Sequence, residues 1–275
     1  MDISTSEFMH KYNHEYVVEH NKRYITLQKY ISGSTVKAYK APDWLMLDSV
    51  KELAKINLAL AGYKIKRYEF KSNWLNEKTI NQKIIKFEKL LEKARKDKSE
   101  FSTKIYEDIS YKMFLLKRIS NVMLLKTNLT YVNSHGDYSI LQQRVQENKI
   151  KATIDFARAC NLPAIWEIVR SYTYASKECE FSKINIENFK RYIYQYIIIM
   201  DLTEIDIKNI LNIYYYQLIL STYGYKEYYK RDIHDKLALL KFAFWRTDMI
   251  RFIDNNGEDI CNQLLVWFRE VIKNK

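Results

Sequence analysis

The sequence predicts an α+β fold in which helices predominate. Apolar residues make up 47% of the 275 positions and only two residues are proline, so the chain can bury a sizeable core. Apolar side chains recur with the helical period through most of residues 42–125 and 163–273. Short runs with strand character occupy residues 14–31 and 138–156. This length is consistent with one large domain or two unequal ones.

The predicted elements follow one another in chain order. The first are two strands within residues 14–31, joined by a turn at His20-Asn21. Pro42 opens the first helix, because proline is favoured in the first helical turn. By the period of their apolar residues, helices are predicted over residues 42–62, 73–95, 103–125, 163–174, 185–199, 203–222, 233–254 and 257–273.

The most informative stretch lies between residues 134 and 172. Within it, "DYSILQQRV" and "KIKATIDF" read as two short strands joined by a polar turn at Glu147-Asn148. Such a hairpin would bring the carboxylates of Asp137, in a His-Gly-Asp turn, and Asp155, after a buried strand, to the same end. One carboxylate can orient a hydroxyl while the other holds a metal ion.

A resemblance to a known family rests on these motifs. "HGD" at residues 135–137, "IDF" at residues 154–156 and "PAIWEIVRSY" at residues 163–172 occur in this order. The set resembles the catalytic core of the aminoglycoside and choline phosphotransferase superfamily, small-molecule kinases with a protein-kinase-like fold. The resemblance implies a helical, protein-kinase-like large lobe with short β-hairpins over residues 34–275. Residues 1–33 would be the remnant of an incomplete small lobe and its hinge.

The resemblance also implies roles for individual residues. Asp137 would be the catalytic base, Asp155 would bind Mg²⁺, and His135 would brace the loop. The family usually has Asn five positions after the catalytic Asp, whereas this chain has Gln142 there, with Gln143 as an adjacent candidate. A Gln amide oxygen can ligate Mg²⁺, but its extra methylene changes the reach to an ion that tolerates little distortion.

The predicted small lobe lacks the family's phosphate-binding apparatus. Kinases of this type carry a glycine-containing loop and a phosphate-pairing lysine there. Of the five glycines in the chain, only Gly33 lies within residues 1–33. The chain is therefore expected to begin inside the small lobe. The backbone at Gln28, Lys29 and Tyr30 would contact the adenine of ATP.

Two functions follow as alternatives. The first is an ATP-dependent phosphotransferase that uses Mg²⁺ and transfers the γ-phosphate to a hydroxyl of a small-molecule substrate. The second is a catalytically inactive, truncated kinase-like protein that binds a small molecule or a protein partner. The acidic pair favours the first, and the missing phosphate loop favours the second.

Two further groups of residues have open interpretations. Glu167 and Arg170 lie one helical turn apart and are expected mainly to pair with each other or with the catalytic loop. The alternative is that they reach the site. Trp245-Arg246-Thr247 could belong to a substrate wall, although no chemical motif supports that assignment.

Composition limits the partners. The net charge of +12 is scattered at helical spacing, so a nucleic-acid partner is not expected. No apolar run approaches the roughly twenty residues that a membrane span needs, and no signal peptide is recognisable. Cys160, Cys179 and Cys261 form neither metal-binding spacing nor an even disulfide set, which fits a reducing, cytoplasmic location.

Overall fold

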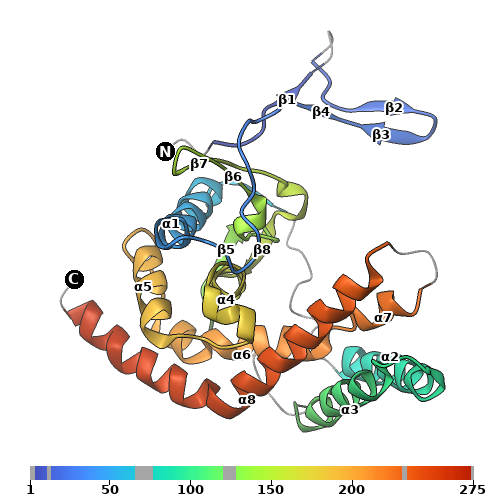
Figure 1. The fold of residues 1–275 in the computed structure, drawn as a ribbon. Helices are drawn as coiled ribbons and strands as arrows, with labels where there is room; N and C mark the ends of the chain where they lie inside the picture. The colour runs from blue at the N-terminus through green and yellow to red at the C-terminus, as the bar shows by residue number, and fades with distance from the viewer. Residues whose placement is uncertain (1–3, 11–13, 66–76, 120–127, 231–233, 274–275) are drawn as a thin grey trace.

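The computed structural model describes residues 4–10, 14–65, 77–119, 128–230 and 234–273. Within these residues the protein is mainly helical, and its strands occur only in short antiparallel pairs (Figure 1). The predicted α+β, mainly α, fold class is therefore confirmed.

The labels of Figure 1 correspond to the following bounds. The helices are α1 (Asp43–Leu60), α2 (Glu77–Lys96), α3 (Ser102–Ile119), α4 (Ala164–Ala175), α5 (Ile186–Ile197), α6 (Glu204–Leu220), α7 (Tyr225–Tyr228) and α8 (Lys236–Lys273). The strands are β1 (Phe8–Met9), β2 (Val18–His20), β3 (Arg23–Ile25), β4 (Leu27–Gln28), β5 (Tyr131–Ser134), β6 (Gln143–Gln146), β7 (Lys149–Thr153) and β8 (Cys160–Pro163).

Residues 4–10 and 14–33 form an N-terminal arm that projects from the helical body (Figure 1). In the arm, β2 pairs with β3 and β1 pairs with β4. The predicted pair of strands is thus confirmed, with its turn at Asn21-Lys22, one residue later than expected. Both turn residues have positive φ, 50° and 60°, as tight hairpin turns require.

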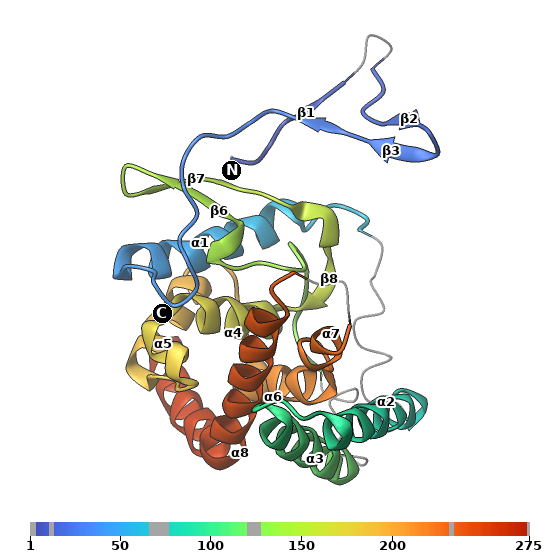
Figure 2. The same cartoon turned by 45° about the vertical axis from the view of Figure 1, so that its right-hand side comes forward.

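The arm meets the body along the hairpin formed by β6 and β7, above which it lies in Figure 2. Ser34 forms an antiparallel bridge with Val145, and Thr5 forms a parallel bridge with Thr153. Most of the arm remains in solvent. Its exposed large apolar side chains are Phe8, Met9, Tyr16, Val17, Tyr24, Ile25, Leu27 and Tyr30.

The core of the body is built around α4, most of whose side chains are buried. Helix α4 lies against α6, which in turn packs along α8, and α1 packs against α5 (Figure 2). Buried tyrosines fill much of this interior, and most of them have a polar partner for the hydroxyl. For example, the hydroxyl of Tyr192 donates to Ser171 and that of Tyr196 donates to Asn57.

Helix α8 corrects one prediction. The sequence predicted separate helices over residues 233–254 and 257–273, but a single helix runs from Lys236 to Lys273. Gly257 lies inside it, where a Cβ would approach Ile253 Cγ2 to 3.0 Å. A glycine within a helix costs about 1 kcal/mol. Burial of Ile253, Ile260 and Leu264 on either side of the glycine offsets that cost.

Most other predicted helices are confirmed within one to three residues at each end. The predicted start at Asn73 and the end of the helix over residues 103–125 lie outside the described residues. Helices α2 and α3 account for the described parts of these two predictions. Among all the helices described, none is both long and apolar enough to cross a bilayer.

Candidate functional site

The predicted catalytic turn, His135-Gly136-Asp137, lies where two strand pairs meet. Strands β6 and β7 form the predicted hairpin, whose turn residues Glu147 and Asn148 have φ of 52° and 54°. Strand β5 pairs antiparallel with β8, with Ser134 opposite Cys160. The residues that follow β5 and those that precede β8 therefore lie side by side. These are the His-Gly-Asp turn and the segment that begins at Asp155.

Gly136 is required where these two segments cross. Its φ of +83° lies in the region that side chains with a Cβ rarely adopt. A Cβ built at this position would lie 1.9 Å from the carbonyl oxygen of Arg158. The close approach places the catalytic turn directly on the short 3₁₀ turn Phe156–Arg158, which follows Asp155.

His135 ties the same two segments together. Its ring is fully buried, and its Nδ1 accepts the backbone N–H of Asp137 at 3.3 Å. Because Nδ1 is the acceptor, the neutral ring carries its proton on Nε2, which donates to the carbonyl of Ile154 at 2.8 Å. The imidazole thus fixes the backbone of Asp137 and the backbone of Ile154, the residue that precedes Asp155. It braces the loop, as the resemblance implied.

Asp137 presents one free carboxylate oxygen. Its Oδ1 accepts from Nη2 of Arg170 at 2.5 Å, and the side chain is 35% exposed. Within the described part of the chain, Oδ2 receives no hydrogen bond. A carboxylate held by one oxygen and open at the other can accept a hydrogen bond from an incoming hydroxyl.

Side chains of helix α4 hold the catalytic turn in place through hydrogen bonds. The carboxylate of Glu167 is buried and accepts hydrogen bonds from Ser134 Oγ and from the backbone N–H of Tyr138 at 2.9 Å. Burial raises the pKa of Glu167, against the lowering effect of these two hydrogen bonds. Arg170 Nη1 donates to the carbonyl of Tyr138 at 2.5 Å. Of the two interpretations of Glu167 and Arg170, contact with the loop is the one observed, and Arg170 also borders the cavity described below.

Asp155 and Gln142 lie on adjoining backbone, since the N–H of Ile154 donates to the carbonyl of Gln142 at 2.8 Å. Asp155 has φ of 65° and an exposed side chain. Within the described residues, neither the Asp155 carboxylate nor the Gln142 amide has a hydrogen bond or ion pair. Gln143 is different, because it is buried and its Nε2 donates to Ser49 Oγ and Tyr138 OH. Gln143 is therefore a core residue, which leaves Gln142 as the amide candidate.

These donors fit Mg²⁺. The ion prefers oxygen ligands and usually keeps several waters while binding one or two carboxylates plus substrate phosphates. A free carboxylate at Asp155 and a free amide oxygen at Gln142 match that pattern. Across the described ranges, no cluster of three or more His, Cys, Asp or Glu side chains is arranged to hold a metal ion. Asp155 and Gln142 would supply two oxygen ligands and leave the remaining positions of Mg²⁺ for water and phosphate oxygens.

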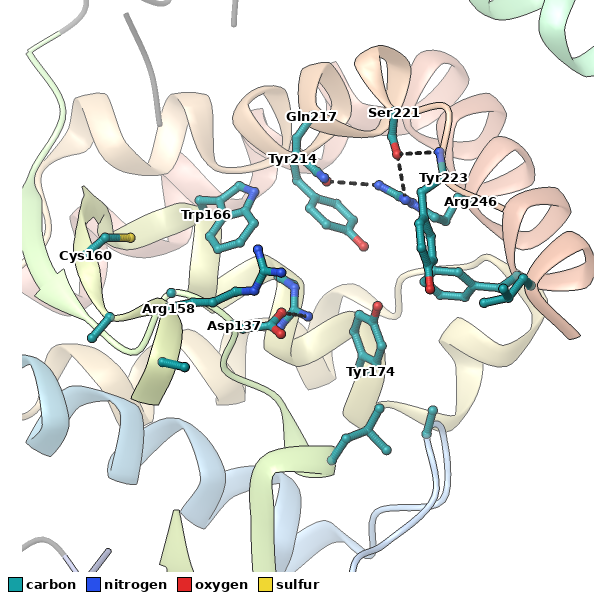
Figure 3. Close-up of a pocket in the computed structure, with 18 of the residues that line it drawn as sticks. Asp137, Arg158, Cys160, Trp166, Tyr174, Tyr214, Gln217, Ser221, Tyr223 and Arg246 are labelled. Carbon is teal, nitrogen blue, oxygen red and sulfur yellow. Dashed lines mark hydrogen bonds and ion pairs between the residues drawn. The ribbon is translucent and has the colours of Figure 1, made fainter. Parts of the chain in front are cut away.

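A cavity of about 1140 Å³ opens beside the catalytic turn (Figure 3). Asp137 borders it, together with Arg158, Arg170 and Arg246. Asp155 does not border it, although Ala157 and Arg158 on the same segment do. The two acidic side chains therefore lie on adjoining segments, and only Asp137 faces this cavity. The aromatic side chains that line it are those of Tyr39, Trp166, Tyr174, Tyr214, Tyr223 and Phe242.

The residues predicted to contact adenine lie elsewhere. Gln28 ends β4 in the N-terminal arm, and the backbone N–H of Lys29 donates to the carbonyl of Glu7. The side chain of Tyr30 is 83% exposed and receives only a long hydrogen bond of 3.4 Å from Arg144. None of Gln28, Lys29 and Tyr30 borders the cavity. The structure does not bring them together with Asp137.

The sequence gives little indication that two arginines, Arg158 and Arg246, border the cavity. Arg158 follows Asp155 by three positions and was not predicted to belong to the site. Arg246 was considered only as part of a wall formed by Trp245-Arg246-Thr247. Of those three residues Arg246 borders the cavity, whereas Trp245 Nε1 donates to the carbonyl of Cys179 in the interior. Only the fold places Arg246 opposite the catalytic turn.

Comparison with known proteins identifies the fold. No family model matches the sequence, and no curated protein is similar to it. Choline kinase from Cryptosporidium parvum Iowa II superposes with a TM-score of 0.59 at 13% identity, covering 95% of this chain and 78% of that one. Amicoumacin kinase hAmiN gives a TM-score of 0.54 at 13% identity, covering 90% and 72%. The aminoglycoside phosphotransferase from Alicyclobacillus acidocaldarius gives 0.51 at 10%, covering 99% and 79%.

These proteins are all kinases or phosphotransferases of one protein-kinase-like superfamily. The resemblance inferred from the His-Gly-Asp and Ile-Asp-Phe motifs is confirmed at the level of the fold. The predicted incomplete small lobe is consistent with the short strand pairs of the N-terminal arm.

Proposed function

We propose that this protein is an ATP-dependent phosphotransferase that transfers the γ-phosphate to a hydroxyl of a small molecule. The observation that carries the proposal is the arrangement of two carboxylates around His135. Asp137 presents a free oxygen to a large cavity, and Asp155 lies free on the adjoining segment. The similarity in fold to choline and aminoglycoside kinases supports the same reaction class.

The chain's own residues would perform three tasks. Asp137 Oδ2 would accept the hydrogen bond, and then the proton, of the attacking hydroxyl. Arg170 and His135 would hold the Asp137 carboxylate and its backbone in place. Asp155 and Gln142 would hold Mg²⁺, which neutralises charge on the phosphates when bound. Positioning and charge compensation make up most of the catalysis that phosphoryl transfer requires.

The test separates binding from transfer. Asp155→Asn should abolish Mg²⁺-dependent ATP binding in calorimetry, because it removes the metal's anionic ligand. Asp137→Asn should leave that binding largely intact and slow transfer by roughly 10²- to 10⁴-fold, the usual range for a lost general base. Asp259→Asn is a matched control, since Asp259 is exposed on α8 and its carboxylate accepts a hydrogen bond from Gln263.

Basal Mg²⁺-dependent ATP hydrolysis provides a transfer readout before the acceptor is known. Loss of activity confined to the two site variants would support the proposal. Unchanged ATP binding and unchanged turnover in both site variants would contradict it.

An inactive kinase-like binding protein is the second candidate. The observation that favours it is the position of Gln28, Lys29 and Tyr30, which are exposed on the arm and do not border the cavity. Residues 1–33 also contain no glycine loop that would hold the β- and γ-phosphates. ATP affinity decides between the two functions. Wild-type protein that shows no Mg²⁺-dependent ATP binding in calorimetry would favour the inactive form.

A further inference from the structure

The cavity beside Asp137 carries an excess of positive charge. Three arginines border it, Arg158, Arg170 and Arg246, and among its described lining residues Asp137 is the single acid. Arg170 is already paired with that acid. The guanidinium groups of Arg158 and Arg246 therefore remain without a carboxylate partner within the described chain. The cavity has an excess of two positive charges, which suits an anionic ligand.

Arg246 is the most informative of the three. It projects from α8 and is only 8% exposed, so its charge is largely removed from water. Its hydrogen-bond partners are neutral, with Nη1 donating to Ser221 Oγ at 2.8 Å and Nη2 donating to Gln217 Oε1 at 3.4 Å (Figure 3). A guanidinium has five N–H donors and does not deprotonate in proteins. Burying such a cation without an anion is costly, so its position indicates a ligand that supplies the negative charge.

A second basic side chain lies at the same place. Lys112 is buried on α3, and its Nζ donates to the backbone carbonyl of Ser221 at 2.5 Å. Ser221 therefore bridges Lys112 and Arg246 through its carbonyl and its hydroxyl. Burial lowers the pKa of Lys112 well below its ordinary value, and the charge of Arg246 lowers it further, while Asp108 acts in the opposite direction. Arg246 thus raises the positive potential that Lys112 experiences.

The two ends of the cavity differ in chemistry. Asp137 lies at one end and Arg246, Ser221 and Gln217 lie at the other, with Tyr174 and Tyr214 between them (Figure 3). Both phenol hydroxyls point into the space, and Thr173 Oγ1 donates to the Tyr214 hydroxyl at 3.1 Å. Aromatic walls of this kind fit a ring or another flat apolar body.

We propose that the acceptor is a small anionic hydroxyl compound whose carboxylate or phosphate group binds Arg246 while its hydroxyl reaches Asp137. This assignment rests on the proposed phosphotransferase function. The assignment excludes cationic acceptors such as quaternary ammonium compounds and polyamines. Their positive charge would lie beside the guanidinium of Arg246 and not beside an acidic side chain. Arg and a carboxylate or phosphate group form charge-assisted, bidentate hydrogen bonds.

The test compares probes of one shape and different charge. Ligand-observed NMR titrations, without nucleotide, would use para-hydroxyphenylacetate, its neutral amide, and the cationic amine tyramine. A fourth probe, para-hydroxybenzylphosphonate, distinguishes a phosphate-type group from a carboxylate. We expect both anions to bind roughly 10- to 100-fold more tightly than the amide and the amine, the ratio that hydrogen bonds to a charged group of about 1.5–3 kcal/mol produce.

Variants locate the site. Arg246→Gln should remove most of the preference for the anions, while Arg269→Gln, which removes the same charge from an exposed position on α8, should leave it unchanged. Arg246→Met is the second variant, because it keeps an apolar stem and eliminates a buried, unpaired charge. The urea midpoint of this variant should not fall below that of the wild type. A loss of anion binding in the variant would then not result from unfolding.

Three results would overturn the assignment. The first is tyramine binding as tightly as the anions, and the second is anion affinity unchanged in both Arg246 variants. The third is competition between the anionic probes and Mg²⁺ with a non-hydrolysable ATP analogue, because that would assign Arg246 to the nucleotide. Arg246-dependent anion binding without any ATP turnover would instead contradict the phosphotransferase function and leave the anion site standing.

Discussion

The N-terminal arm and the catalytic turn differ sharply in how the rest of the molecule holds them. In the arm, the side chains of Tyr24 and Tyr30 are 77% and 83% exposed. In the catalytic turn, His135 and Tyr138 are fully buried. Both regions contain short strand pairs joined by tight turns, so the difference comes from tertiary packing and not from local structure.

The contacts of each region explain the contrast. The arm has an ion pair between Lys29 and Glu7 at 3.8 Å, with both side chains about three-quarters exposed, and such pairs contribute little. The turn is held by the buried side chains of His135 and Glu167. The acceptor side of the proposed site is therefore preorganised, whereas the segment predicted to contact adenine lies in the least supported part of the described fold.

The largest effect is expected from Gly136→Ala. The added Cβ would collide with the carbonyl oxygen of Arg158, and the φ of +83° would be strained for alanine. The turn must then move and lose the hydrogen bonds of His135. We expect the free energy of unfolding to fall by about 4 kcal/mol, the sum of backbone strain and lost contacts. Chemical denaturation measures it.

Gly62→Ala is the matched control for that substitution. Nothing lies within 4 Å of a Cβ at Gly62, and its φ is not positive. The free energy of unfolding should change by less than about 0.5 kcal/mol. If both substitutions changed the free energy of unfolding equally little, this result would contradict the close approach of Gly136 to the carbonyl oxygen of Arg158.

Glu167→Ala tests the support of the turn from α4. The substitution leaves the backbone N–H of Tyr138 and the hydroxyl of Ser134 without their buried acceptor. Each unsatisfied group costs about 1–3 kcal/mol, so we expect a loss of about 2–4 kcal/mol in the free energy of unfolding. Glu167→Gln keeps an acceptor oxygen for Tyr138 and should lose much less. An equal loss in both variants would contradict this hydrogen-bonding role.

The same residue makes stability depend on pH. Because burial raises the pKa of Glu167 above its ordinary value of 4.5, the folded protein binds more protons there than the unfolded chain does. This contribution is fully present below pH 4.5 and is lost as the pH rises through the raised folded value. Urea titrations should show the stability of the wild type falling relative to Glu167→Gln over that interval. A difference that stays constant or grows with pH would contradict the raised pKa.

Local patterns predicted the elements that local interactions determine. The helical period and Pro163 predicted α4, and alternating residues around a polar turn at Glu147-Asn148 predicted the β6–β7 hairpin. The resemblance of the His-Gly-Asp and Ile-Asp-Phe motifs to a known family predicted the kinase-like fold. Each of these signals lies within about twenty consecutive residues.

Features that depend on tertiary packing could not be predicted in this way. Residues 255 and 256 were predicted to separate two helices, yet α8 runs through them and packs along α6. Gln143 was an adjacent alternative to Gln142 in the sequence, and only the fold shows that Gln143 is buried against Ser49. Arg246 is separated from Asp137 by more than a hundred residues, so only the packing of α8 beside α6 shows that both border one cavity.

The smallest effect on stability is expected from the arm. Replacing Tyr24 and Ile25 together by serine removes two side chains that are 77% and 48% exposed. We expect the free energy of unfolding to change by less than about 0.5 kcal/mol. Ile193→Ala, at a fully buried position of α5, is the reference from the body and should cost about 2–5 kcal/mol. If the double substitution approached that cost, the arm would be packed in solution against a surface that the monomer leaves open, and the contrast between the two regions would fail.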